Sequence, residues 1–200
     1  MSAGEFMDAE RVRRAIAPLI DRLRPECTKL ELAGSLRRGR DRIRDVELVA
    51  VSARTIDWVE RDLFGQPIRR RRHAGLSVDE PLDAMLRAGT IVHPERKAWG
   101  DRLRRFIVKA SQDVPVELYL ADPARFGWIL VIRTGPVDFS KYCVQRAKRR
   151  GLQVRDGGLY RRTELVPTPT EEAVFELLGW PTPTPEQRND REEWPRWTTF

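Results

Sequence analysis

The segment from residue 34 to residue 51 constrains the fold of this chain more than any other. It begins with a small-residue turn, Gly34-Ser35, and passes through several arginines to an apolar run that follows Asp45. The run has the alternation and the β-branched content of a β-strand. Alternate side chains of a strand share a face, so we expect Asp45 and Glu47 to point to the same side. Two carboxylates one pleat apart can share a hard divalent cation such as Mg²⁺.

A second strand supplies a third candidate carboxylate. The run 114–120 places apolar residues at 116, 118 and 120 on one face and leaves Glu117 and Tyr119 on the other. Two-metal phosphoryl transfer requires several oxygen ligands from neighbouring elements. We therefore expect Glu117 to join Asp45 and Glu47.

These motifs resemble those of a known enzyme family. The Gly-Ser turn followed by the acidic pair resembles the nucleotidyltransferase superfamily, and the two arginines of the segment 34–38 resemble those of family X DNA polymerases. Downstream, the segment 126–160, with its Arg133-Thr134-Gly135 motif, is similar to the thumb of that family, as is the segment 165–179. The resemblance covers roughly residues 10–188.

The resemblance implies an α+β fold in three parts. Residues 1–122 would form a nucleotidyltransferase palm, with a mixed sheet and flanking helices. Residues 123–188 would form a small helical thumb with a β-hairpin, followed by a C-terminal tail, 189–200. Because no segment matches a lyase, fingers or phosphoesterase domain, we expect a palm and a thumb only.

The resemblance also implies two-metal chemistry at the three acids. Asp45 and Glu47 would bridge two Mg²⁺ or Mn²⁺ ions, while Glu117 would bind the catalytic ion and lie nearest to the 3′-hydroxyl proton. The family usually has aspartate at all three positions. The extra methylene of Glu117 therefore predicts either low activity or a preference for the larger Mn²⁺ ion.

The expected nucleotide site combines the Gly-Ser turn with the Thr-Gly motif. Ser35 and Arg38 match the triphosphate contacts of the family, whereas Arg37 is expected to point away. In place of the aromatic pair that limits ribonucleotide use, this chain has Ile132-Arg133, so its choice of sugar stays open; Arg133 could reach phosphate or stack on a base. The residues expected at the nucleotide are Gly34, Ser35, Arg38, Arg44, Arg133 and Gly135.

Charge favours a polyanionic partner. Lys and Arg number 37 against 30 Asp and Glu, which gives a formal net charge of +7. One expected helix has a basic side suited to backbone phosphates, and residues 69–72 form a second basic cluster. The expected DNA contacts are Lys141, Arg146, Lys148 and Arg149. We expect a monomer that binds primer-template or gapped DNA and dNTPs.

Other features place the chain among intracellular proteins. No apolar stretch approaches the roughly 18 residues of a membrane span, and the N-terminus lacks the pattern of a signal peptide. Cys27 and Cys143 are too few for a disulfide framework or a zinc site, so we expect reduced thiols. The expected location is the cytoplasm, or the interior of a cell infected by a virus that encodes the protein.

Periodicity and breaker residues give the expected elements. Helices are expected at 8–24, 36–41, 55–64, 81–88, 122–132, 139–150 and 170–178. Strands are expected at 30–33, 45–51, 105–109 and 114–120, with a hairpin of 152–155 against 159–161. Residues 66–80 are expected to form a loop, and residues 181–200 a poorly ordered extension apart from packed tryptophans.

The favoured interpretation is a template-directed DNA nucleotidyltransferase that fills short gaps. Two alternatives stay open. The missing sugar-gate aromatics would suit a template-independent or ribonucleotide-adding transferase, and Glu117 would suit a nucleic-acid-binding relative that has lost catalysis.

Overall fold

A six-stranded mixed sheet forms the centre of the N-terminal part. The computed structural model describes residues 5–73, 75–94 and 99–194. The strand order is β2-β4-β10-β9-β7, with β8 also paired to β9; β4 and β10 run parallel and the other pairs antiparallel. The strands are β2 (Cys27–Leu32), β4 (Val46–Ser52), β7 (Ile91–Val92), β8 (Trp99–Gly100), β9 (Leu103–Val108) and β10 (Val114–Leu120). The α+β class is as expected.

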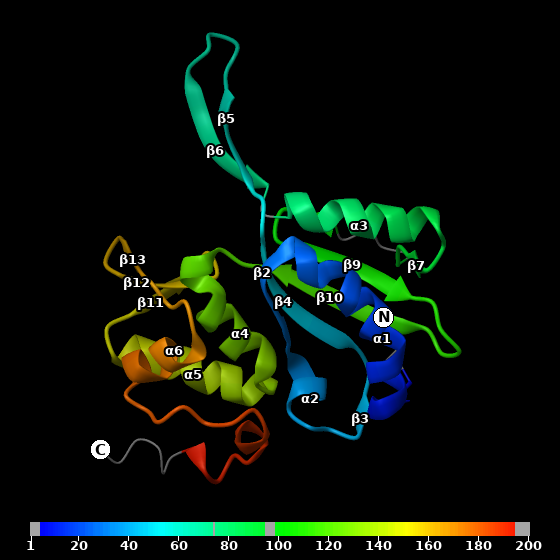
Figure 1. Ribbon diagram of the computed structural model, residues 1–200. Helices are drawn as coiled ribbons and strands as arrows, with labels where there is room; N and C mark the ends of the chain where they lie inside the picture. Colours follow the sequence, from blue (N-terminus) through cyan, green and yellow to red (C-terminus); the bar gives the residue numbers. More distant parts are fainter. Residues whose placement is uncertain (1–4, 74, 95–98, 195–200) are drawn as a thin grey trace.

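Helices cover both faces of this sheet (Figure 1). The helices α1 (Ala9–Leu23) and α3 (Leu76–Arg87) bury their apolar sides against the face that carries Val46 and Leu118. The opposite face, which carries Val49 and Tyr119, packs against α4 (Phe126–Thr134). Because strand side chains alternate, the acids at positions 47 and 117 share the face turned toward α4.

Several expected elements are present with shifted ends. The helix expected at 8–24 is α1, and Asp8 caps it by accepting a hydrogen bond from the Arg11 amide. A short 3₁₀ turn, η1 (Arg24–Glu26), leads from α1 into β2. The short helix α2 (Gly34–Arg37) begins two residues before the expected range 36–41. Two short strands that were not predicted, β1 (Met7–Asp8) and β3 (Arg42–Ile43), pair with each other.

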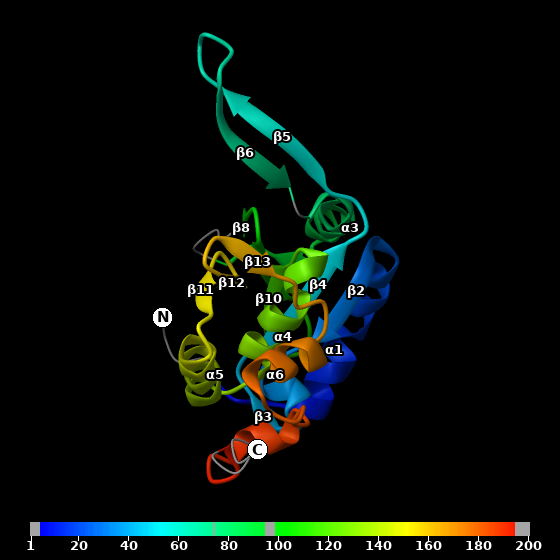
Figure 2. The same cartoon turned by 90° about the vertical axis from the view of Figure 1, so that its left-hand side faces the viewer.

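The expected helix at 55–64 and the expected loop at 66–80 are wrong. Residues 56–73 instead form a two-stranded ribbon, β5 (Ile56–Arg61) and β6 (Pro67–His73), which projects from the body in both views (Figures 1 and 2). The isoleucine, tryptophan and valine at the start of this segment favour a strand, and the Asp62 side chain closes the turn by accepting from the amides of Phe64 and Gln66. The helical periodicity of this segment extends over too few residues to outweigh these strand signals.

The helix expected to start at Pro81 starts earlier. In α3 the Gly75 carbonyl accepts hydrogen bonds from the amides of Val78 and Asp79, so the helix is nucleated upstream and Pro81 lies inside it. Pro81 therefore lies near the start of α3 but is not its first residue.

The C-terminal part has its own apolar core. It contains η2 (Pro123–Arg125), α4, α5 (Val137–Arg149), the strands β11 (Gln153–Arg155), β12 (Gly158–Arg161) and β13 (Glu164–Val166), and α6 (Glu171–Leu178). The predicted hairpin is β11–β12, and β13 adds a third strand that was not predicted. The core gathers side chains from α4, α5, β12 and α6 around Phe139 and Phe175.

The expectation of a poorly ordered C-terminal extension is wrong for residues 181–193, whereas the packed tryptophan that it included is confirmed at position 194. This segment forms a 3₁₀ turn, η3 (Glu186–Asn189), and buries Arg188 completely. Trp194 is 5% exposed and its ring packs edge-on against Phe139 at 5.4 Å between centroids. The remaining part of that expectation, residues 195–200, lies outside the described residues.

Within residues 5–73, 75–94 and 99–194, no helix combines the length and the apolar character needed to cross a membrane.

Candidate functional site

The three predicted acids lie at neighbouring positions of two adjacent strands. Glu47 in β4 and Glu117 in β10 are direct partners in the parallel register, and Asp45 directly precedes β4. The local sequence produces this placement, because the apolar neighbours of both glutamates are buried on the other face of the sheet. The structure therefore brings the three predicted acids to one region of the sheet.

Electrostatics in this region disfavour negative charge. Burial, followed by the charges of Asp45 and Glu117, raises the pKa of the Glu47 carboxyl to about 7, although Arg133 and Arg38 oppose the shift. Asp45 keeps a solvent-exposed surface, yet desolvation and the nearby Glu117 charge raise the pKa of its carboxyl. Carboxylates that repel one another in this way would be stabilised by a cation between them.

The carboxylate of Glu117 is turned toward two donors of the sheet. Arg105 Nε donates to Glu117 Oε1 at 2.6 Å, and the Tyr119 hydroxyl donates to Glu117 Oε2. Among the described residues, no three His, Cys, Asp or Glu side chains converge into a formed metal-ligand group. The donor set itself, three carboxylates, suits Mg²⁺ or Mn²⁺, but Glu117 has to share its oxygens with the donors that hold it.

Gly34 lies in close contact with the acid at position 47. Its φ of +64° is in the left-handed region, and a Cβ added there would collide with Glu47 Oε2. The Ala33 amide donates to the Glu47 carbonyl at 2.8 Å, which fixes the turn against β4. Only glycine fits both the backbone conformation and this approach. Ser35 follows in α2, half-buried.

Arg37 points away from the acids, as expected, into an ion-pair network. Its guanidinium binds the Glu171 carboxylate through both oxygens, at 2.9 and 2.8 Å, and also reaches Thr134 Oγ1. On the other side, the fully buried Arg188 donates to Glu171 Oε1 at 2.7 Å. Burial would raise the pKa of the Glu171 carboxyl, but the hydrogen bonds from Arg188 and Arg37 hold it below its usual value.

Arg38 contacts protein groups rather than open solvent. Its Nε donates to Asn189 Oδ1 at 2.9 Å, and Nη1 donates to the Thr134 carbonyl. Asn189 returns a hydrogen bond to the Arg38 carbonyl at 3.1 Å. Burial lowers the pKa of Arg38, partly offset by the charge of Glu47. To bind phosphate, Arg38 would either use its remaining N–H donors or release one of these protein partners.

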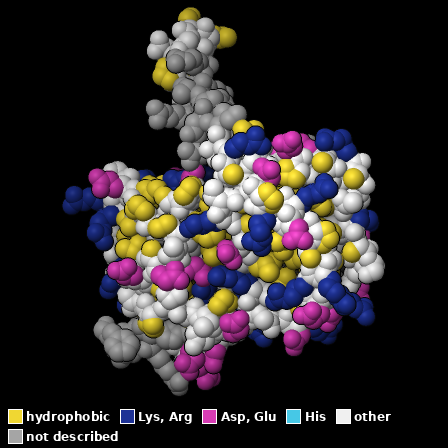
Figure 3. All heavy atoms as spheres, in the orientation of Figure 1, with side chains coloured by type: hydrophobic (Ala, Val, Ile, Leu, Met, Phe, Trp, Pro, Cys, Tyr) yellow, Lys and Arg dark blue, Asp and Glu magenta, His cyan; other side chains and the backbone are white. Residues whose placement is uncertain are grey.

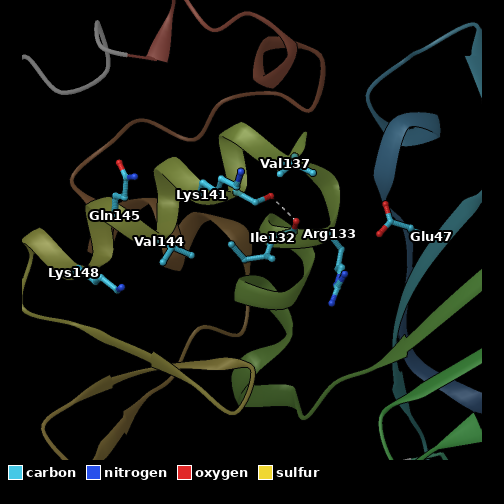
Figure 4. Close-up of a pocket in the computed structure, with 10 residues that line it drawn as sticks. Glu47, Ile132, Arg133, Val137, Lys141, Val144, Gln145 and Lys148 are labelled. Atoms are coloured by element: carbon cyan, nitrogen blue, oxygen red, sulfur yellow. Dashed lines mark hydrogen bonds between the residues drawn. The ribbon is translucent and has the colours of Figure 1, made fainter. Parts of the chain in front are cut away.

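An open pocket of about 530 Å³ separates Glu47 from the helix α5 (Figure 4). Arg133, from the end of α4, stands between Glu47 and the rest of the pocket in this view. Its guanidinium carbon lies 3.8 Å from the ring centroid of Tyr119. The polar lining residues are Glu47, Arg133, Ser140, Lys141, Gln145 and Lys148.

The predicted basic residues of α5 divide into two groups. Lys141 and Lys148 line the pocket and are exposed, and Arg149 is also exposed. Arg146 is half-buried and donates to the Leu178 carbonyl at 2.9 Å, so it holds α6 against α5. On the face shown in Figure 3, basic side chains are interspersed with acidic ones over both parts of the molecule.

The other predicted nucleotide residues lie at the edges of this region. Gly135 ends α4 and lines the pocket, with Phe139 packed against it. Arg44, next to Asp45, is exposed and stacks on the Phe6 ring at 4.3 Å.

Sequence reasoning missed several residues of the site. Glu171 lies 134 positions from Arg37 and Asn189 lies 151 positions from Arg38, and Arg188 joins this network through Glu171. No sequence signal indicates these pairings. Arg105 could have been found, because a basic residue in the strand before Glu117 can pair across an antiparallel ladder.

One protein-family model matches the C-terminal part of the chain. Residues 129–189 match the family model described as DNA polymerase beta thumb. The C-terminal part of this chain is therefore similar to a DNA polymerase beta thumb. The thumb match spans most of α4, α5, the three-stranded sheet, α6 and η3, so it includes the helix that carries the pocket lysines and the residues that bind Arg37 and Arg38. No curated protein matches the chain in the corresponding search.

Proposed function

We propose that this chain is a DNA-directed nucleotidyltransferase, which adds dNTPs to a primer 3′-hydroxyl and fills short gaps. The observation that carries the proposal is the register of β4 and β10, which sets Glu47 beside Glu117 and next to Asp45. Glu47 faces, across an open pocket, the helix α5, which lies within the segment that matches a DNA polymerase beta thumb. In this proposal residues 1–122 act as the palm and residues 123–188 as the thumb.

The carboxylates would hold two divalent ions, Mg²⁺ or Mn²⁺. When bound, such ions lower the pKa of the attacking hydroxyl and neutralise charge on the leaving pyrophosphate. The raised pKa values of Asp45 and Glu47 support a cation at this position, since burial and the repulsion between the acids outweigh the nearby arginines. Glu117 would accept the proton of the 3′-hydroxyl.

The remaining residues would bind and orient the substrates. The amide and hydroxyl of Ser35, at the start of α2, would donate to a terminal phosphate, while Gly34 allows the turn to lie against Glu47. Arg133 would contact the nucleotide from the α4 side, and Arg38 would do so after exchanging a protein partner. Lys141 and Lys148 would bind DNA phosphates, which position a duplex without reading its sequence.

One alternative has a specific observation in its favour. Arg133 lies where the sugar-contacting aromatics of the family would lie, and it covers the Tyr119 ring. A transferase that accepts ribonucleotides, or that ignores a template, would fit a pocket without that aromatic gate. A relative without catalysis is the other alternative, because Glu117 is engaged by Arg105 and Tyr119.

Primer extension on a one-nucleotide gap separates these possibilities. We expect wild-type protein to insert the templated dNTP with Mg²⁺ or Mn²⁺, and Asp45→Asn to abolish insertion while gapped DNA still binds. Insertion of every dNTP regardless of template, or equal use of rNTPs, would favour the alternative transferase. If the wild-type protein binds gapped DNA but inserts no nucleotide under all the conditions tested, the proposed function is wrong.

A further inference from the structure

Two donors from different strands hold the carboxylate of Glu117. Arg105 is the direct antiparallel partner of Glu117, and its Nε lies 2.6 Å from Oε1. Tyr119 is two residues further along β10, on the same face, and its hydroxyl donates to Oε2. Each carboxylate oxygen therefore has its own protein donor.

The Tyr119 donor is itself fixed by packing. Tyr119 is 8% exposed and belongs to the apolar cluster between the sheet and α4, together with Val49 and Phe126. The Arg133 guanidinium lies over its ring, 3.8 Å from the centroid. A ring enclosed in this way cannot leave its rotamer without displacing its neighbours, so the hydroxyl is a rigid donor.

A glutamate needs such support more than an aspartate does. Its side chain has one additional torsion, so a free carboxylate samples a wider range of positions. A misplacement of about 1 Å at a reacting group can reduce the rate by about 100-fold. Two donors, one from β9 and one from β10, restrict this freedom.

We propose that Tyr119 and Arg105 are positioning residues that fix the Glu117 carboxylate beside Glu47 for cation binding. The inference rests on the proposed function and extends it to residues that do not touch the substrates. A carboxylate offers about four lone-pair sites, so two of them stay available after both protein bonds are made. The donors therefore orient Glu117 without preventing it from acting as a ligand.

The hydrogen bond can be tested in the free protein by a double-mutant cycle. Tyr119→Phe, Glu117→Ala and the combined variant would be unfolded in urea without divalent ions. We expect the combined effect on the unfolding equilibrium to differ from the sum of the single effects, because the two groups interact. Additive effects would overturn the inference, whatever the activity of the protein.

Measurements of cation binding test whether the two donors support Glu117 as a metal ligand. Mn²⁺ affinity would be measured by titration calorimetry, because removal of a partner of a metal ligand typically weakens metal binding about 10–100-fold. We expect at least a tenfold loss in Tyr119→Phe, with a lower kcat and a KM for dNTP within about twofold of wild type. Arg105→Gln should have the same direction of effect, and Arg105→Lys should restore part of it.

Tyr160→Phe is the matched control. Tyr160 is also buried, at 7% exposure, and its hydroxyl also has a charged partner, because it accepts a hydrogen bond from Arg125, but it lies in β12 and not beside the three acids. Equal Mn²⁺ affinity and kcat in Tyr119→Phe and Tyr160→Phe would overturn the inference and leave the proposed function standing. A wild-type protein that binds Mn²⁺ but never extends a primer would contradict only the proposed function, and one that binds no Mn²⁺ would overturn both.

Discussion

The Glu47 carboxyl makes the stability of the ion-free protein dependent on pH. Its pKa is about 7 in the folded protein against an ordinary value of 4.5, so the folded state holds an extra proton between these values. The free energy of unfolding must therefore fall as the pH rises through this window. Glu47→Gln removes this titrating group, so its free energy of unfolding should not show this fall. Between about pH 5 and about pH 8, we expect the stability of the variant to rise by roughly 1–3 kcal/mol relative to that of the wild type.

Urea unfolding in EDTA at the two pH values measures this difference. Glu164→Gln, at an exposed position of β13, is a suitable control because it changes the same group far from the acids. A stability difference between wild type and Glu47→Gln that does not change with pH would contradict the prediction.

Gly34 is a second position where a single residue matters. A Cβ here would face both a φ of +64° and the Glu47 carboxylate. We expect Gly34→Ala to destabilise the fold by roughly 1–3 kcal/mol and to reduce primer extension more than tenfold, because the turn must move away from β4. Gly89→Ala is the control, since its φ is +70° but its Cβ would meet no atom within 4 Å; equal losses of activity in the two variants would refute the steric explanation.

At the scale of elements, α5 carries the proposed contact with DNA. Lys141 and Lys148 face the same pocket, and each phosphate contact contributes to the dependence of binding on salt. We expect Lys141→Gln with Lys148→Gln to weaken binding of gapped DNA and to reduce the slope of log K against log salt by about 2. Fluorescence anisotropy over a range of salt concentrations measures both quantities.

The control variant removes the same charge from α1. Arg11 and Arg22 are exposed on that helix, which covers the opposite face of the sheet. If Arg11→Gln with Arg22→Gln changes the slope as much as the α5 variant does, binding follows net charge and the assignment of α5 is wrong.

At the scale of the whole molecule, the buried carboxylate of Glu171 connects the N-terminal part to the C-terminal segment. Glu171 pairs with Arg37 near the start of the sheet and with Arg188 near the C-terminus. Removing one charge of a buried network leaves the others uncompensated, so we expect Glu171→Gln to cost about 3–5 kcal/mol of unfolding free energy. Glu172→Gln, one residue along the same helix and exposed, should cost less than about 0.5 kcal/mol. Equal denaturation midpoints of the two variants would contradict this account.

The sequence predicts the sheet acids and most helices because those signals are local. The alternation around Glu47 and Glu117 and the capped pattern of α1 are visible within a few residues. The β5–β6 ribbon was misassigned because a short apolar run fits a helix and a strand equally well until its partner strand is known. The contacts of Arg37 and Arg38 could not be predicted, because they join positions that only the complete fold brings together.

The β5–β6 ribbon projects from the body of the molecule (Figures 1 and 2). Among the strands of the described residues, β5 and β6 pair only with each other, and the side chains of Leu63 and Phe64 at the tip are 101% and 88% exposed. Replacing the residues of this turn with a foreign peptide would therefore leave the central sheet and the C-terminal core with the same neighbours as before. The protein thus offers an insertion point at which an epitope or a fluorescent label can be attached without touching the carboxylates.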